Sequence, residues 1–120
     1  SRGRLKASDA SIKNAVRQIR WQAEIAYNTN NNSYKDFQIL PLINEEMVIL
    51  LEEIDKSYGE DPAPPYITTI RDNQTNDFCV SAPSRAEIGM FHCIDATGES
   101  KLTSSACPTQ PDIGPPLLCP

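Results

Sequence analysis

Apolar residues recur at helical spacing in the first part of the chain. Within SRGRLKASDASIKNAVRQIRWQAEIAYN, one narrow arc of a helical wheel collects Leu5, Ile12, Val16, Ile19, Ala23, Ala26 and Tyr27. The pattern predicts an amphipathic helix over residues 1–29 that rests on a core. The following NTNNNSY ends this helix, because Asn side chains compete for backbone hydrogen bonds and tolerate left-handed geometry.

Two apolar residues of the same segment lie nearly opposite this stripe. Trp21 and Ile25 therefore form a second apolar patch that the core does not cover. Either the loop that follows the helix folds over the patch, or another subunit covers it.

A second helix is predicted from NEEMVILLEEIDKSYG. Asn44 is its expected cap, Glu45 and Glu46 occupy the first turn, and Gly59 ends it. The buried face is expected to consist of Met47, Leu50, Leu51 and Ile54. After it, EDPAPP at residues 60–65 is a turn or short linker, since prolines exclude helix and central strand.

The rest of the chain has the alternation and composition of short strands. YITTIR, DFCVSA and GMFHCIDA are rich in β-branched and aromatic residues and are separated by turn sequences, which predicts three antiparallel strands. The tail that begins at TGESK has too much proline for sheet or helix. The expected fold class is α+β, a long N-terminal helix packed on a small antiparallel sheet. The single domain, 1–120, divides into a helical stem (1–29), a connecting region with the second helix (30–65), the sheet (66–97) and a disulfide-bearing C-terminal loop (98–120).

All four cysteines lie in the last third of the chain, at Cys79, Cys93, Cys107 and Cys119. Their spacing contains no CxxC, and only His92 is available as a further ligand, so a zinc site fits poorly. Disulfides are expected instead, which indicates an oxidising compartment. Of the three connectivities, we favour Cys79 with Cys93 and Cys107 with Cys119, because each closes a short loop.

Charge divides the chain into a basic stem and an acidic body. The first 20 residues carry a charge of about +5. Because the net charge of the chain is −5, the remaining residues carry about −10. Nucleic-acid binding is not expected, because it normally needs a basic face on the whole domain together with aromatic stacking. The hydrophobic fraction of 39% is that of a chain that folds, and no run of about 20 apolar residues spans a bilayer.

The sequence offers no set of catalytic side chains. His92 is the one histidine, and no carboxylate or free thiol is positioned beside it in sequence, so we interpret it as structural. The glycines are scattered and form no phosphate-binding loop. We therefore expect no catalytic residues, no metal and no cofactor, and we predict that the protein is not an enzyme.

Two stretches of the chain resemble bacterial type IV pilins and the related pseudopilins of type II secretion. SRGRLKASDASIKNAVRQIRWQAEIAYNTNNNSY resembles the pilin helix, with the Ala-Glu-x-x-Tyr turn at Ala23, Glu24 and Tyr27. FCVSAP with FHCIDATGESK is similar to the closing strands of a pilin subgroup, through the Cys-x-Asp-x-x-Gly pattern that begins at Cys93. The resemblance covers roughly the first 35 and the middle 25 residues. The N-terminal processing site and its glutamate are not in the chain, and the second helix departs from the pattern as an insertion.

The resemblance implies a structural subunit, a pilin or minor pilin, of an extracellular fibre. Its partners would be further copies of itself or related pilins, and an apolar segment before residue 1 would anchor it in the inner membrane before assembly. The charge split places Arg17, Arg20, Trp21 and Ile25 at the subunit interface, where the two arginines would meet the acidic second helix of a neighbouring copy.

Three alternatives stay open. The same fold would serve an adhesive or DNA-capturing tip subunit, or a type II secretion pseudopilin. A secreted, disulfide-stapled inhibitor or small enzyme would require the helical stripe to be fully buried within the monomer.

Overall fold

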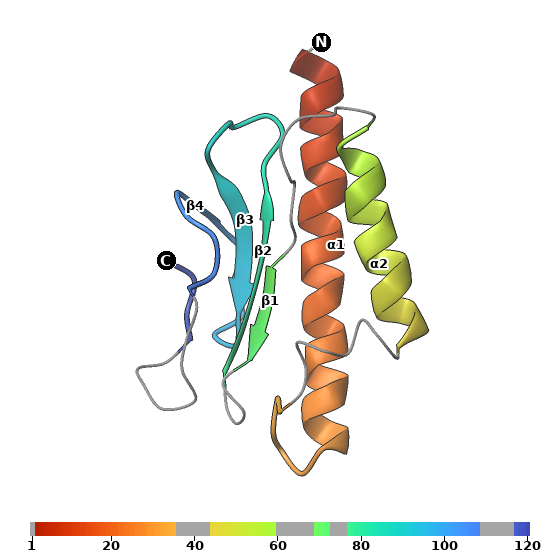
Figure 1. The fold of residues 1–120 in the computed structure, drawn as a ribbon, viewed down its shortest axis with the longest axis vertical. Helices are drawn as coiled ribbons and strands as arrows, with labels where there is room; N and C mark the ends of the chain where they lie inside the picture. Colours follow the sequence, from red (N-terminus) through yellow and green to blue (C-terminus); the bar gives the residue numbers. More distant parts are fainter. Residues whose placement is uncertain (1, 36–43, 60–68, 73–76, 109–116) are drawn as a thin grey trace.

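A computed structural model describes residues 2–35, 44–59, 69–72, 77–108 and 117–120 of the protein. These residues form two helices and four strands in the order α1 (Arg2–Thr29), α2 (Glu45–Ser57), β1 (Thr69–Asp72), β2 (Phe78–Pro83), β3 (Phe91–Asp95) and β4 (Lys101–Thr103). Helix α1 lies between the sheet and α2, and contacts both (Figure 1). The predicted α+β architecture, a long N-terminal helix on an antiparallel sheet, is confirmed.

Helix α1 buries the stripe that the sequence predicts. Its fully buried side chains are Ile12, Ala15, Val16, Ile19 and Ala23. Leu5, at the start of the predicted stripe, is only half-buried. The polar remainder of α1 carries many charges, and no helix among the described residues is long and apolar enough to cross a membrane.

The asparagine-rich stretch ends α1 as expected. Asn31 and Asn32 have φ values of 53° and 57°, which is the left-handed region, and the Asn32 N–H donates to the carbonyl of Tyr27. Tyr34 then turns back onto the helix, where its hydroxyl donates to Glu24 Oε1 over 2.9 Å and its ring contacts Tyr27. Burial and the bond to the Glu24 carboxylate raise the pKa of Tyr34.

Helix α2 has the predicted cap and buried face. The side-chain oxygen of Asn44 accepts a hydrogen bond from the Met47 N–H, and Gly59, with φ +69°, follows the last turn. Met47, Leu50 and Ile54 are buried against α1, whereas Leu51 is half-buried. The predicted turn EDPAPP lies outside the described residues.

The sheet is an antiparallel meander in the order β1-β2-β3-β4. Val80 pairs with Ile94 and Ser81 with Cys93, which fixes the two faces of the central pair of strands. The prediction that the tail contains no sheet is wrong for residues 101–103. These three residues precede the prolines and pair with β3 as a short edge strand.

Alternation along β2 and β3 sends apolar side chains to α1. Phe78, Val80, Ala82 and Ile94 join the buried residues of both helices in one core. The opposite face of the same strands carries Cys79, Ser81, Cys93 and Asp95, and the C-terminal segment covers it. Residues on this outer face are buried although the helices do not touch them.

Candidate functional site

A cleft of about 570 Å³ lies between α1 and the turn that joins β3 to β4. Its walls include Arg17, Arg20 and Trp21 from the helix, and Gly98, Glu99 and Ser100 from the turn. Three of the four residues predicted for a subunit interface therefore line this one cleft. The fourth, Ile25, lies one helical turn beyond Trp21 and is 53% exposed.

Arg20 is held at the floor of this cleft by the β3–β4 turn. Gly98 has φ +113°, and a Cβ at this position would lie 3.1 Å from Arg20 Nη2, so the missing side chain leaves room for the guanidinium. The Arg20 Nε is buried and has no hydrogen-bond partner. Within the described part of the chain, neither Arg17 nor Arg20 forms an ion pair. The cleft thus presents cationic donors that the described chain leaves unsatisfied.

Trp21 forms an open wall of the cleft and is 69% exposed. The loop described after α1 folds back at Tyr34 rather than across the indole. The described residues of this loop, 30–35, do not cover the Trp21 and Ile25 patch, and both side chains are solvent-exposed.

All four cysteines form disulfides, as predicted, but the favoured pairing is wrong. The bridges join Cys79 to Cys107 and Cys93 to Cys119. The register explains why the neighbouring strands do not bridge directly. Cys79 lies opposite Asp95 and Cys93 opposite Ser81, so the two cysteines are diagonal neighbours on the outer face and each bonds instead to the segment that covers them.

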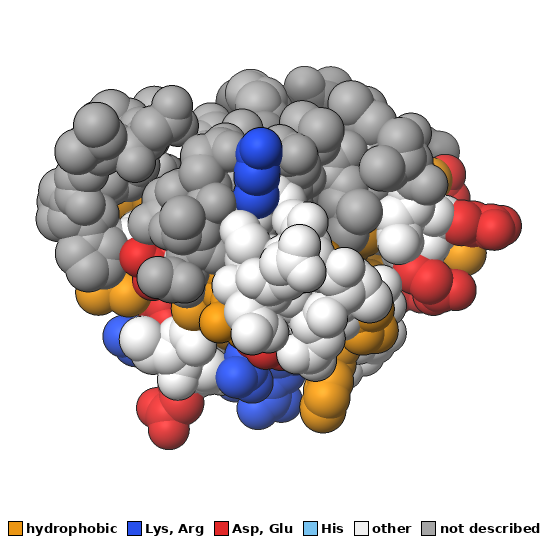
Figure 2. Space-filling view, turned by 90° about the horizontal axis from the view of Figure 1, so that it is seen from below, with side chains coloured by type: hydrophobic (Ala, Val, Ile, Leu, Met, Phe, Trp, Pro, Cys, Tyr) orange, Lys and Arg blue, Asp and Glu red, His pale blue; other side chains and the backbone are white. Residues whose placement is uncertain are grey.

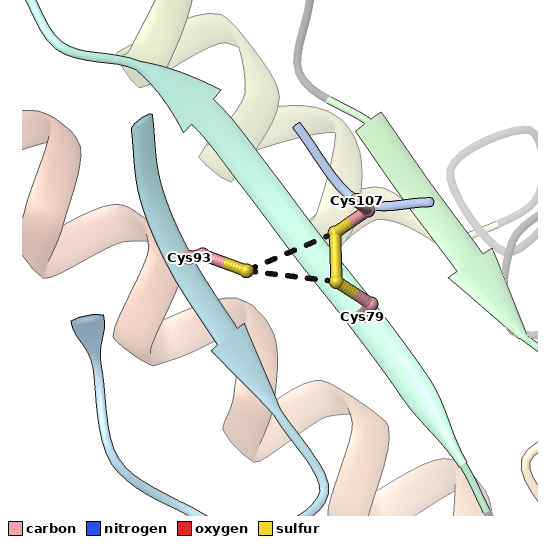
Figure 3. A group of neighbouring side chains, drawn as sticks. All are labelled: Cys79, Cys93 and Cys107. Atoms are coloured by element: carbon pink, nitrogen blue, oxygen red, sulfur yellow. Dashed lines mark hydrogen bonds between the residues drawn. A yellow bond between two sulfur atoms is a disulfide. The ribbon is translucent and has the colours of Figure 1, made fainter. Parts of the chain in front are cut away.

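The sulfur atoms nevertheless form one cluster. The Sγ atom of Cys93 lies 3.5 Å from that of Cys79 and 4.0 Å from that of Cys107, and it points at their bridge (Figure 3). A metal would need thiolate ligands, and no described cysteine is a free thiol. In this oxidation state the cluster does not fit a metal, and it joins β2 and β3 to the end of the chain.

A half-buried carboxylate, Asp9, which sequence reasoning missed, joins α1 to the loop between β2 and β3. Asp9 accepts hydrogen bonds from Ser84 Oγ (2.6 Å) and from the Arg85 N–H (2.6 Å), and its Oδ2 lies 3.1 Å from His92 Nε2. Burial alone would raise the pKa of Asp9, but these bonds outweigh it and hold the pKa below its ordinary value. The sequence gives no signal for this contact, because its partners are more than 70 residues away.

The three residue types at Asp9 match those of a hydrolase triad, but their order does not. A nucleophilic serine donates to histidine, and the carboxylate lies behind the histidine. Here both Ser84 Oγ and His92 Nε2 meet the same oxygen of Asp9, and Ser84 Oγ also accepts from the Glu87 N–H. The geometry fixes the loop to the helix and leaves Ser84 without a base.

A second buried carboxylate anchors the C-terminus. Asp95 accepts from the Thr97 N–H and hydroxyl through Oδ1, and from the Cys119 N–H through Oδ2 over 2.8 Å. Burial would raise the pKa of Asp95, yet the Thr97 and Cys119 bonds lower it overall. Asp95, two residues after the disulfide-bonded Cys93 on the same strand, thus attaches the C-terminal segment as the disulfides do.

Comparison with protein-family models, with curated proteins and with solved structures finds no match to this chain.

Proposed function

We propose that the chain is a structural subunit, a pilin or minor pilin, of an extracellular type IV pilus-like fibre, and that it assembles through α1. The observation that carries the proposal is the difference between the two faces of α1. One face is fully buried in the core, while the opposite face presents Trp21 and Ile25 to solvent. A large apolar pair rimmed by charged residues is typical of a surface that another protein covers.

The shape of α1 suits repetition along a fibre. It spans 28 residues, which corresponds to about 42 Å at 1.5 Å per residue, and the longest dimension of the molecule is 46 Å. A rod as long as the whole domain gives each copy an extended surface for its neighbours. Packing many such rods side by side places the sheets on the outside.

The disulfides support a location outside the cytoplasm. Two bridges attach the C-terminal segment to β2 and β3, and such bridges persist in oxidising compartments. A fibre exposed to the medium benefits from this covalent attachment, because the outer layer of each subunit then resists local opening.

The proposal is tested in cells that produce the protein. Deleting its gene should remove a class of surface filaments, and filaments sheared from wild-type cells should contain the chain as a major component. Restoring the gene with Trp21→Asp should leave the protein present in the cells but reduce the sheared filaments. Filaments that persist unchanged in the deletion strain would exclude a major subunit, and a trace amount in them would favour a tip subunit.

A further inference from the structure

The molecule carries two surfaces with opposite charge on different sides. The cleft described above lies on the side of α1 that faces the β3–β4 turn. The other side of α1 meets α2, where Arg4, Ser8 and Ser11 face Glu53 and Ser57. Figure 2 shows acidic side chains gathered on the right, where Figure 1 places α2, and basic side chains next to hydrophobic ones on the lower side.

The outward face of α2 combines carboxylates with exposed apolar groups. Val48 and Ile49 are partly exposed, Glu52 lies one turn beyond Val48, and Asp55 lies a further turn along the same face. Neither carboxylate forms an ion pair within the described residues. This face offers two apolar side chains and two acids, and the cleft region offers Trp21 and Ile25 with Arg17 and Arg20. The two surfaces therefore match in both charge and apolar character.

The chain cannot close this contact on itself, because its own α2 is packed on the opposite side of α1 from the cleft. From this placement we infer that the cleft receives the outward face of α2 from a second copy of the chain. The contact is heterologous: one copy supplies the cleft and the next supplies the acidic helix. The copy that supplies the cleft keeps its own α2 face unused, and the copy that supplies α2 keeps its own cleft unused. The contact therefore repeats from copy to copy.

The chemistry of the cleft fits a carboxylate from Glu52 or Asp55 of the second copy. Arg20 lines the cleft, and Gly98 leaves room there for its guanidinium, so an incoming carboxylate would meet the guanidinium from the cleft side. The Arg20 Nε is buried and plays no part in this contact. Arg17 is exposed beside it, and the Trp21 wall would cover the apolar pair of the incoming helix. Glu99, the acid among the lining residues, lowers the positive charge of the cleft, and the two arginines have to outweigh its repulsion of an incoming carboxylate.

The single tryptophan of the chain makes the contact directly measurable. Trp21 is mostly exposed in the single chain. When the chain is concentrated at low ionic strength, a second copy should cover the indole and shift its fluorescence emission to shorter wavelength. Added salt should reverse the shift, since the contact is partly electrostatic. Arg17→Glu on one side, or the pair Glu52→Arg and Asp55→Arg on the other, should each raise the dissociation constant by roughly tenfold or more.

Mixing the two variants gives the decisive result. The α2 variant retains a wild-type cleft and the Arg17→Glu variant retains a wild-type α2, so the mixture should recover pairs with wild-type affinity although neither variant associates alone. Lys13→Glu makes the same charge change on α1 outside the cleft lining and should weaken the contact far less. Thermal unfolding of each variant checks that the fold is intact; Arg20, which packs on Gly98, is left unchanged for this reason.

Several outcomes would overturn the inference. These are a Trp21 emission that does not depend on chain concentration, a mixture that fails to recover pairs, or an α2 variant that still associates. A shift produced by inorganic phosphate at any chain concentration would assign the cleft to a free anion instead. The repeat along a fibre rests on the proposed function, whereas the solution measurement of the contact does not. Recovery of pairs on mixing, in a protein whose cells make no filaments of it, would reject the fibre and keep the contact. Filaments built from the chain, with no recovery on mixing, would keep the fibre and reject the contact.

Discussion

The two faces of the sheet are buried by different means. On the inner face, Phe78, Val80 and Ile94 pack against α1, which supplies a continuous apolar stripe. On the outer face, the described residues of the covering segment (104–108 and 117–120) bury Leu117 as their one large apolar side chain apart from the cysteines, and two disulfides and the Asp95 hydrogen bonds hold the segment in place. A long helix brings enough apolar surface to stay attached by burial, whereas a short tail needs covalent bonds.

This difference predicts separate responses of the two layers. The inner layer depends on packing and should fail cooperatively with the whole fold. The outer layer depends on bonds that a reductant can break, so it should open while α1 remains on the sheet. The predictions below test this separation in order of decreasing effect on stability.

Removing the largest fully buried side chain of the inner face should have the largest effect. Phe78→Ala takes away a ring that also makes an edge contact with Tyr34, and we expect a loss of about 3–5 kcal/mol in the free energy of unfolding. Urea unfolding followed by circular dichroism measures it. Ile88→Ala, on a side chain that is 94% exposed, should change stability by less than about 0.5 kcal/mol.

Removing one bridge of the outer face should cost less and act locally. The double variant Cys93→Ser and Cys119→Ser should lose about 2–4 kcal/mol. Amide hydrogen exchange in this variant should rise first at position 119, whose N–H donates to Asp95 in the wild type, while Ile19 and Val80 stay protected. Equal loss of protection in α1 would show that the two layers are not separable.

The Asp9 contact between α1 and the β2–β3 loop makes the free energy of unfolding depend on pH. Because the folded pKa of Asp9 lies below its ordinary value of 3.8, its stabilising effect is present above that pH and is lost as the pH falls through the folded pKa. Asp9→Asn should cost about 1.5–3 kcal/mol at pH 7 and flatten the acid side of the stability profile. Ser84→Ala, which removes one donor to this carboxylate, should give an intermediate profile. A variant as acid-sensitive as the wild type would show that Asp9 does not carry the effect.

The exposed helix face should show the smallest effect on folding. Trp21→Ala removes a side chain that touches little of the folded chain, and the unfolding free energy should change by less than about 0.5 kcal/mol. The same variant should fail to self-associate in sedimentation experiments at concentrations where the wild type does. Loss of several kcal/mol would instead make Trp21 part of the monomer core.

The sequence allowed prediction of the elements whose pattern is local. The 3.6-residue stripe of Ile12, Val16 and Ile19 and the Asn44 cap were sufficient for both helices, and alternation was sufficient for β2 and β3. It also predicted that Trp21 and Ile25 lie opposite the core stripe, because helical geometry fixes their directions, and it assigned Arg17 and Arg20 to the same interface from the charge split. The other wall of the cleft, at Gly98 and Ser100, could not be predicted, since it depends on how α1 crosses the sheet.

Long-range contacts account for what the sequence did not reveal. The disulfide pairing follows from a register in which Cys79 opposes Asp95, and loop length alone favoured the wrong partners. The Asp9 and Ser84 contact joins residues 75 positions apart. Strand β4 was missed because three residues carry too little pattern, and the prolines that follow them dominated the composition.

The central claim, that copies of this chain build a fibre, is tested most directly by electron microscopy of producing cells labelled with gold-conjugated antibodies against the folded domain. A structural subunit predicts gold particles at intervals along the whole length of each surface filament. Labelling confined to filament tips would reassign the chain to a tip subunit, and filaments without any label would contradict the account.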